Sequence, residues 1–161
     1  MLKTLGATML ARDWFGELRW KVTCIAKVEE VIKAMRLKVG AHGQKFDAIG
    51  KGCGSDISVA AIAIAEAEIK LDEMRAKVEP EIETATAVLY GLSGRGGLAK
   101  QRCSADTDCI LGYYVMGMSW HEVACEMVKP DSRDAEQWCK RRAYRALAAL
   151  DEYDWRELIN S

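Results

Sequence analysis

Apolar residues recur every three or four positions over much of the chain, which is the period of an amphipathic helix. The first such segment runs from about residue 8 to residue 39. Its apolar positions, which would share one helix face, are Trp14, Leu18, Val22, Ile25, Val28, Ile32 and Met35. Its cationic positions, mostly off that face, are Arg12, Arg19, Lys27, Lys33 and Lys38. Such a run is usually a solvated face, and a phosphate-contacting face is the alternative.

A second segment, residues 57–92, repeats apolar residues every seven positions, as paired helices do. The repeating positions are Ile57, Ile64, Leu71, Val78 and Ala85. Because the phase carries across Pro80, we predict one long helix that is kinked there, with a break at Pro80 as the alternative. Asp56 or Ser58 is suited to cap its start. Together the two segments predict a helical hairpin that is either self-contained or dimerising.

Two glycine clusters divide the chain. Residues 40–56 hold five glycines but do not match a phosphate-binding loop, because Gly50-Lys51 is followed by Gly52 and no strand precedes them. We therefore predict a connector there. Residues 91–97 hold four glycines and precede shorter elements. This cluster predicts a boundary between a long-helix oligomerisation region, residues 1–92, and a C-terminal domain, residues 98–161.

Helix signals in the C-terminal part predict three further helices. Ser104 is suited to cap the first, and Gly117 to end it. Ser119 and Glu122 have the spacing of a capping box at the start of a second, short helix. The third would start at Asp131 or Ser132 and reach about Leu150. Its expected inner stripe is Ala135, Cys139, Ala143, Ala146 or Leu147, and Leu150.

A short helix, a turn and a longer helix form the layout of a helix-turn-helix. Residues 137–147 hold four basic side chains and no acidic one, although residues 101–161 carry a net charge of −3. Local cationic clusters of this kind suit contacts with nucleic acid, and a solvated helix face is the alternative. The DNA-contacting candidates are Arg133, Gln137, Lys140, Arg141, Arg142, Tyr144 and Arg145.

The amino-acid composition indicates the fold class, the cellular location and the state of the cysteines. Twenty-two alanines and two prolines favour an all-α protein with a long N-terminal hairpin and a C-terminal helix-turn-helix domain. No apolar run reaches the length of a membrane span, and the first residues lack a secretory signal, so we expect a cytoplasmic protein that does not bind membranes. The six cysteines form no C-x-x-C pair and have no regular spacing to the two histidines, which indicates free thiols and no metal site.

Two short stretches resemble a known family. Residues 117–124, GMSWHEVA, are similar to the G-[LM]-S-[WY]-x-E-[IV]-A stretch of sigma-factor region 4, and residues 140–147, KRRAYRAL, are similar to the end of its recognition helix. The layout resembles small phage transcriptional regulators of the late-gene activator type. The segment between Ala124 and Arg145 is longer than in that family. Trp138 stands where the family has a small or hydroxylated contact residue, and it either packs inward or touches DNA.

The resemblance implies a DNA-binding transcriptional regulator, encoded by a phage or prophage and acting in the bacterial cytoplasm. It would act at a promoter on double-stranded DNA, in contact with host RNA polymerase, as a homo-oligomer, most simply a dimer. The alternatives are a DNA-packaging adaptor similar to a phage terminase small subunit and a module that binds only protein. We expect no enzyme activity and no cofactor, because His121-Glu122 is explained by the capping box and no catalytic motif is present. Residues 151–161 are expected to pack as a tail.

Overall fold

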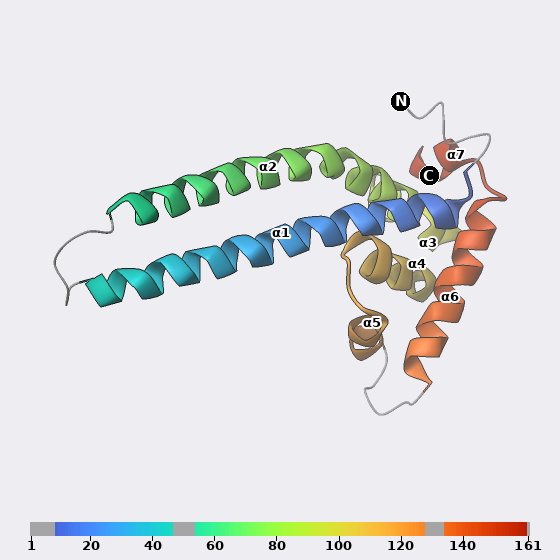
Figure 1. Ribbon diagram of the computed structural model, residues 1–161. Helices are drawn as coiled ribbons and strands as arrows, with labels where there is room; N and C mark the ends of the chain where they lie inside the picture. Colours follow the sequence, from blue (N-terminus) through green and yellow to red (C-terminus); the bar gives the residue numbers. More distant parts are fainter. Residues whose placement is uncertain (1–8, 47–53, 128–133, 161) are drawn as a thin grey trace. The chain divides into compact units, whose positions relative to one another are not determined.

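The computed structural model describes residues 9–46, 54–127 and 134–160. Within these residues all regular secondary structure is helical, which confirms the predicted all-α class. The elements, shown in Figure 1, are α1 (Ala11–Phe46), α2 (Gly54–Tyr90), α3 (Gly97–Gln101), α4 (Ser104–Ile110), the π-helical turn η2 (Leu111–Val115), α5 (Trp120–Met127), α6 (Ala135–Leu150) and α7 (Trp155–Asn160). None of the described helices combines the length and apolar character that crossing a membrane requires.

Residue contacts divide the chain into two units. Unit 1 comprises Met1–Val22 and Val78–Ser161, and unit 2 comprises Thr23–Lys77. Both long helices contribute to both units. The predicted boundary at residues 91–97 therefore falls inside unit 1, because the last turns of α2 belong to the same core as the short C-terminal helices. Tyr90 donates a hydrogen bond to Asp108 of α4, and the backbone N–H of Leu92 donates to the carbonyl of Ile159.

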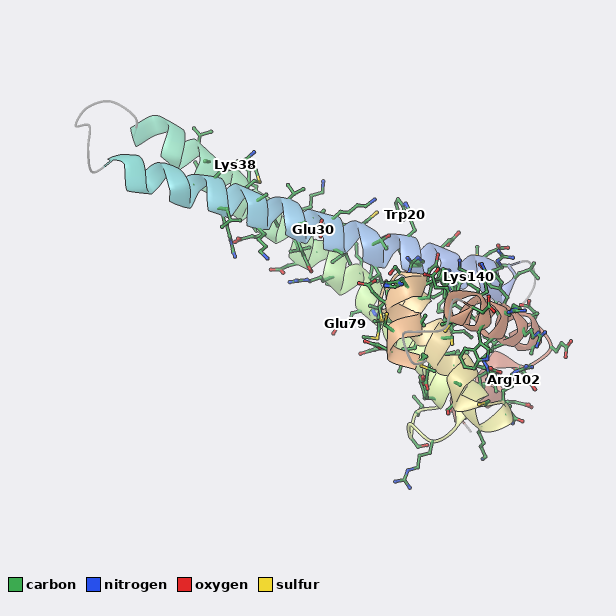
Figure 2. The ribbon with its side chains drawn as sticks, turned by 90° about the horizontal axis from the view of Figure 1, so that it is seen from below. Trp20, Glu30, Lys38, Glu79, Arg102 and Lys140 are labelled. Carbon is green, nitrogen blue, oxygen red and sulfur yellow. The ribbon has the colours of Figure 1, made fainter. Side chains whose placement is uncertain are left out.

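Unit 2 is built from the two long helices, which lie side by side within it (Figure 1). Ile32 of α1 and Leu71 of α2 are buried, as the apolar stripes predict. Ion pairs join Arg36 to Glu68, and Glu29 to Arg75 at 2.7 Å between Oε1 and Nη2. The exposed surface of α1 carries charged residues, such as Glu30 and Lys38 labelled in Figure 2, and also the apolar side chains of Trp20, Val31 and Leu37.

The predicted connector is shorter than the glycine pattern indicates. Residues 40–46 continue α1 and residues 54–56 begin α2, while residues 47–53 lie outside the described part of the chain. Further along, α2 continues through Pro80 without a break, as predicted. Val78 and Ala85 on either side of Pro80 are buried, so the apolar stripe of this helix is intact there. Lys21 of α1 pairs with Glu81 of α2 at 2.6 Å within unit 1.

The core of unit 1 collects residues from distant parts of the chain. The inner stripe predicted for α6 is confirmed, because Ala135, Cys139, Ala143, Ala146, Leu147 and Leu150 are all buried. Phe15 of α1 is fully buried in the same unit but is absent from the predicted stripe, which assigned Trp14 to the apolar face. Trp14 is half-buried. Leu158 of α7 is also buried, so the tail packs on the unit as predicted.

Three helix starts differ from the predictions. The helix α2 begins at Gly54, so Asp56 and Ser58, the predicted caps, lie inside it. The N-cap of α4 is Cys103, not Ser104, whose carbonyl instead accepts a hydrogen bond from the Thr107 hydroxyl at 2.7 Å. The helix α6 begins at Ala135, after Asp134, whose side chain makes no capping hydrogen bond. The predicted caps of that helix, Asp131 and Ser132, lie outside the described residues. Gly117 ends the preceding helical segment with φ +74°, as predicted.

Candidate nucleic-acid interface

The start of α5 is fixed by a reciprocal pair of hydrogen bonds. The backbone N–H of Ser119 donates to Oε2 of Glu122 at 2.6 Å, and the backbone N–H of Glu122 donates to Oγ of Ser119 at 3.2 Å. This is the capping box that the sequence predicts. The hydrogen bonds from Ser119 favour the charged carboxylate and lower the pKa of Glu122. A structural role therefore accounts for Glu122.

Val123 of α5 packs close to the backbone of Gly112. A Cβ added to Gly112 of η2 would lie 3.0 Å from Cγ2 of Val123, so a side chain there would require Val123 to shift by a few tenths of an ångström. Val123 and Ala124 are buried, and α5 packs against α6. The unpredicted π-helical turn places this glycine opposite α5. The absence of a side chain at position 112 thus leaves room for Val123 of α5 against η2.

The outward face of α6 carries most of the residues predicted to contact DNA. We call this face the α6 strip and define it as Gln137, Lys140, Arg141, Tyr144 and Arg145. All five are exposed or half-buried, and they lie away from the buried stripe of the helix. Among the described residues, neither Arg141 nor Arg145 forms an ion pair with a carboxylate, and Nε of Arg141 donates to the Gln137 carbonyl at 3.2 Å. Arg133 lies outside the described residues.

Acidic neighbours partly balance one end of the strip. Nζ of Lys140 lies 4.0 Å from Oε2 of Glu136, and Nδ1 of His121 lies 3.3 Å from Oε1 of the same carboxylate. These groups are exposed or half-buried, so the attraction is worth only a few tenths of a kcal/mol in water. A stronger anion that approached Lys140 would therefore displace Glu136 at little cost.

Arg142 differs from the residues of the α6 strip because it pairs with a buried carboxylate, Asp106. Its Nη1 donates to Oδ1 of Asp106 at 2.8 Å, and its guanidinium lies 4.2 Å from the centre of the Trp138 ring. Asp106 is buried, and its Oδ2 also accepts a hydrogen bond from Nε of Arg102 at 3.2 Å. Arg142 therefore ties α6 to α4. Trp138 is half-buried on the flank of α6.

Tyr144 lies within an aromatic cluster. Its ring meets the Trp120 ring edge-on at 6.1 Å, and Trp120 stacks on Tyr113 at 3.8 Å with a 10° interplanar angle. The guanidinium of Arg12 lies over the Tyr144 ring, 4.6 Å from the centre of that ring. Arg12 therefore adds a cation from α1 to the same part of unit 1, although its position in the sequence favours a solvated face.

Arg19 joins α1 to the segment between α4 and α5. It donates hydrogen bonds to the carbonyls of Tyr113 and Met118, the second at 2.8 Å, and lies 3.5 Å from the centre of the Tyr113 ring. Sequence reasoning missed Arg12, Arg19 and Arg102 as parts of the site, since each lies far along the chain from α6. No local signal marks a contact of this kind.

Comparison with known proteins adds no relative. The chain matches no protein-family model, no curated protein and no solved structure.

Proposed function

We propose that the protein is a sequence-specific DNA-binding transcriptional regulator in which α5, the following segment and α6 act as a helix-turn-helix. The α6 strip carries the proposal: it places three cations, an amide and a phenol on one accessible helix face. A face of this kind suits a DNA groove, since Lys and Arg bind phosphates or guanine edges and Gln reads adenine.

The remaining cations suit a supporting role. Arg142 holds α6 to α4 through Asp106, so we assign it to the fold of the DNA-binding unit and not to base contacts. Lys140, Arg141 and Arg145 are the proposed phosphate contacts or base contacts, and Gln137 is the proposed base reader. With three or four phosphate contacts per protomer, log affinity should fall with log salt at a slope of about −3 to −4.

The test is a double charge reversal on the strip. Lys140→Glu with Arg141→Glu should abolish binding to duplex DNA, because two attractive contacts become repulsive. The matched control is Lys27→Glu with Lys38→Glu, which changes the net charge equally at exposed positions of α1. Binding is titrated against duplexes of mixed sequence and against duplexes that the wild-type protein enriches from a random pool, at about 50 and 200 mM salt.

Helix content and melting temperature must accompany these titrations. The added glutamate at position 140 faces Glu136 and should cost a few tenths of a kcal/mol, too little to unfold the chain. A folded strip variant that binds DNA with the affinity and salt slope of the control would contradict the proposal. Such a result would leave α6 facing protein or solvent.

Two proposals about assembly follow from the resemblance of the sequence to phage regulators. The first is a homodimer formed through the long helices, acting at a promoter with host RNA polymerase. The alternative is a DNA-packaging adaptor similar to a terminase small subunit, which also joins DNA-binding helices to oligomerising ones. Mass measurement in solution separates them, because an adaptor should form a large closed ring and a regulator a monomer or dimer.

A further inference from the structure

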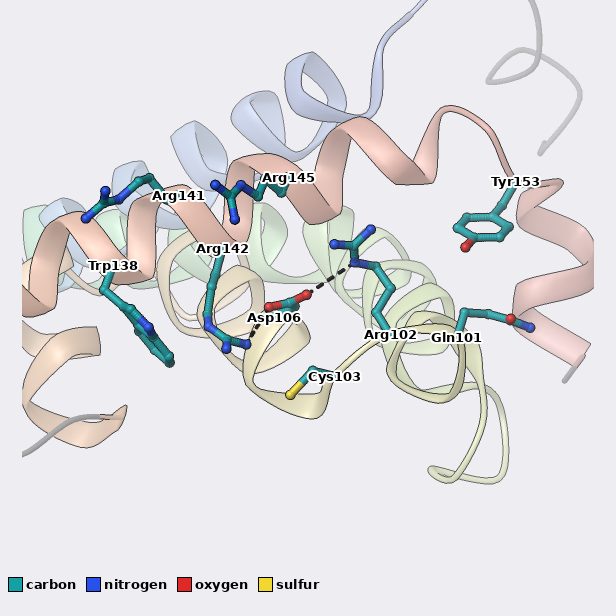
Figure 3. Close-up of a pocket in the computed structure, with 9 residues that line it drawn as sticks. All are labelled: Gln101, Arg102, Cys103, Asp106, Trp138, Arg141, Arg142, Arg145 and Tyr153. Carbon is teal, nitrogen blue, oxygen red and sulfur yellow. Dashed lines mark hydrogen bonds and ion pairs between the residues drawn. The ribbon is translucent and has the colours of Figure 1, made fainter.

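A cavity of about 720 Å³ lies on the flank of α6 within unit 1 (Figure 3). Its walls come from the end of α3, the start of α4, α6 and the turn that follows α6. Four of its lining residues are arginines, namely Arg102, Arg141, Arg142 and Arg145. A volume of this order is typical of a cleft that takes a small molecule or part of a larger one.

The charges in this cavity do not balance. Among the described residues that line it, Asp106 is the one acidic side chain, against four guanidinium groups. Figure 3 shows Arg102 and Arg142 reaching this carboxylate from two sides, at 3.2 and 2.8 Å. Arg141 and Arg145 have no carboxylate partner among the described residues. The described lining of the cavity thus carries an excess of three positive charges, and its two outer arginines, Arg141 and Arg145, are available to an anion.

The type of cation indicates the type of anion. Guanidinium groups present several N–H donors in a plane and pair with phosphate through two parallel hydrogen bonds. The partial burial of Arg102 and Arg142, whose side chains are 32% and 33% exposed, reduces the screening of their charges by water. Asp106 fixes both side chains, so they need little ordering when an anion binds.

We infer that this cavity binds phosphate-ester groups through Arg141, Arg145 and the outer N–H groups of Arg102. The source that the structure favours is a DNA backbone phosphate beside the groove that α6 enters, and this part rests on the proposed function. Arg141 and Arg145 belong both to the α6 strip and to the cavity. A strand that contacts the strip can therefore pass its phosphates into the cavity without leaving α6.

Arg102 allows the test, because it lines the cavity but does not belong to α6. Arg102→Ala should reduce the salt slope of duplex binding by about 0.9 and weaken binding about three- to tenfold for every sequence. Between about 50 and 200 mM salt the variant should then lose about 3.5-fold less affinity than the wild type. Asp106 keeps Arg142 as its partner, so the fold should persist.

The matched control is Arg95→Ala, which removes the same charge from an exposed turn outside the cavity. A second arm titrates the wild type and both variants with pyrophosphate in phosphate-free buffer, followed by calorimetry. If Arg102→Ala lowers the melting temperature, Arg145→Ala replaces it in the pyrophosphate arm, because Arg145 forms no ion pair among the described residues.

The outcomes separate this inference from the proposed function. Binding of either probe that depends on Arg102 and not on Arg95 supports the phosphate site. If pyrophosphate binds in this way and duplex DNA does not bind at all, the proposed function is wrong and the cavity serves a free phosphate ester. If duplex DNA binds well but both arginine variants behave alike with both probes, the proposed function stands and the inference is overturned. Failure of the wild type to bind either probe overturns both.

Discussion

Alanine substitutions in the glycine-rich turn that joins α2 to α3 test how closely the backbone packs in the unit that supports α6. Gly94 and Gly97 both have left-handed backbone conformations, with φ of +73° and +63°. A Cβ added at Gly94 would have no atom within 4 Å. A Cβ added at Gly97 would lie 2.6 Å from the backbone N of Gly91 and 2.7 Å from backbone atoms of Leu89 and Tyr90. The two alanine substitutions therefore share a conformational cost and differ in steric cost.

The shared cost is about 1–2 kcal/mol, the penalty for an L-residue in this region, offset by up to about 1 kcal/mol from the reduced freedom of the unfolded chain. Gly94→Ala should thus destabilise the protein by about 1 kcal/mol. Gly97→Ala adds an overlap with backbone atoms that cannot rotate away, and overpacking of this kind costs a further 1–3 kcal/mol. We expect a total of about 2–4 kcal/mol for Gly97→Ala.

The assay is thermal unfolding followed by circular dichroism, with urea unfolding as a second measure of the free energy of unfolding. For a chain of this length, 1 kcal/mol corresponds to about 2–4 °C in melting temperature. Gly94→Ala should therefore melt within a few degrees of the wild type, and Gly97→Ala about 5–15 °C below it. Equal shifts for the two variants would refute the close approach of Gly97 to the end of α2.

Two further predictions concern pH and the core of unit 2. Burial raises the pKa of the Cys109 thiol from 9.0 to about 12 and that of the Tyr114 hydroxyl from 10.0 to about 12. Their neutral forms thus favour the folded state fully below about pH 9, and this stability is lost as the pH rises towards 12. Alkaline titration of the free energy of unfolding should show the loss. Tyr114→Phe should make the loss above about pH 10 smaller, because only the contribution of Cys109 remains. In unit 2, Leu71→Glu should unfold the helix pair or change the mass of the protein in solution, because Leu71 is only 7% exposed. An unchanged mass and melting temperature would contradict the burial of this apolar stripe. The control for the melting temperature is Ile69→Glu, at a position that is 63% exposed.

Local signals predicted the local features of this fold well. The inner stripe of α6, the capping box of α5 and the stop at Gly117 each depend on residues within a few positions of one another. Helix periodicity and hydrogen bonding to nearby backbone groups act over that range, so the sequence carries them directly. The continuity of α2 through Pro80 followed in the same way from an apolar phase on both sides of it.

Features that depend on tertiary packing were not predictable in this way. The burial of Phe15 instead of Trp14 depends on contacts with residues about a hundred positions away, such as the Tyr114 ring at 6.0 Å. The pairing of Arg102 and Arg142 with one carboxylate depends on how α4 packs on α6. The α6 strip could be predicted from the spacing of its residues, but the cavity on its flank could not, because four of its nine described lining residues come from residues 101–106.

Residues from both ends of the sequence complete unit 1. The backbone N–H of Ala11 donates to Oδ1 of Asp151 at 2.7 Å, across 140 positions of the sequence. Arg19 holds the carbonyls that precede α5, and Phe15 is fully buried in the same unit. The predicted C-terminal domain, residues 98–161, therefore lacks part of its own core when taken alone. The first turns of α1 and the last turns of α2 support the position of α6, so the proposed DNA contacts depend on residues far outside the segment that carries the sequence motif.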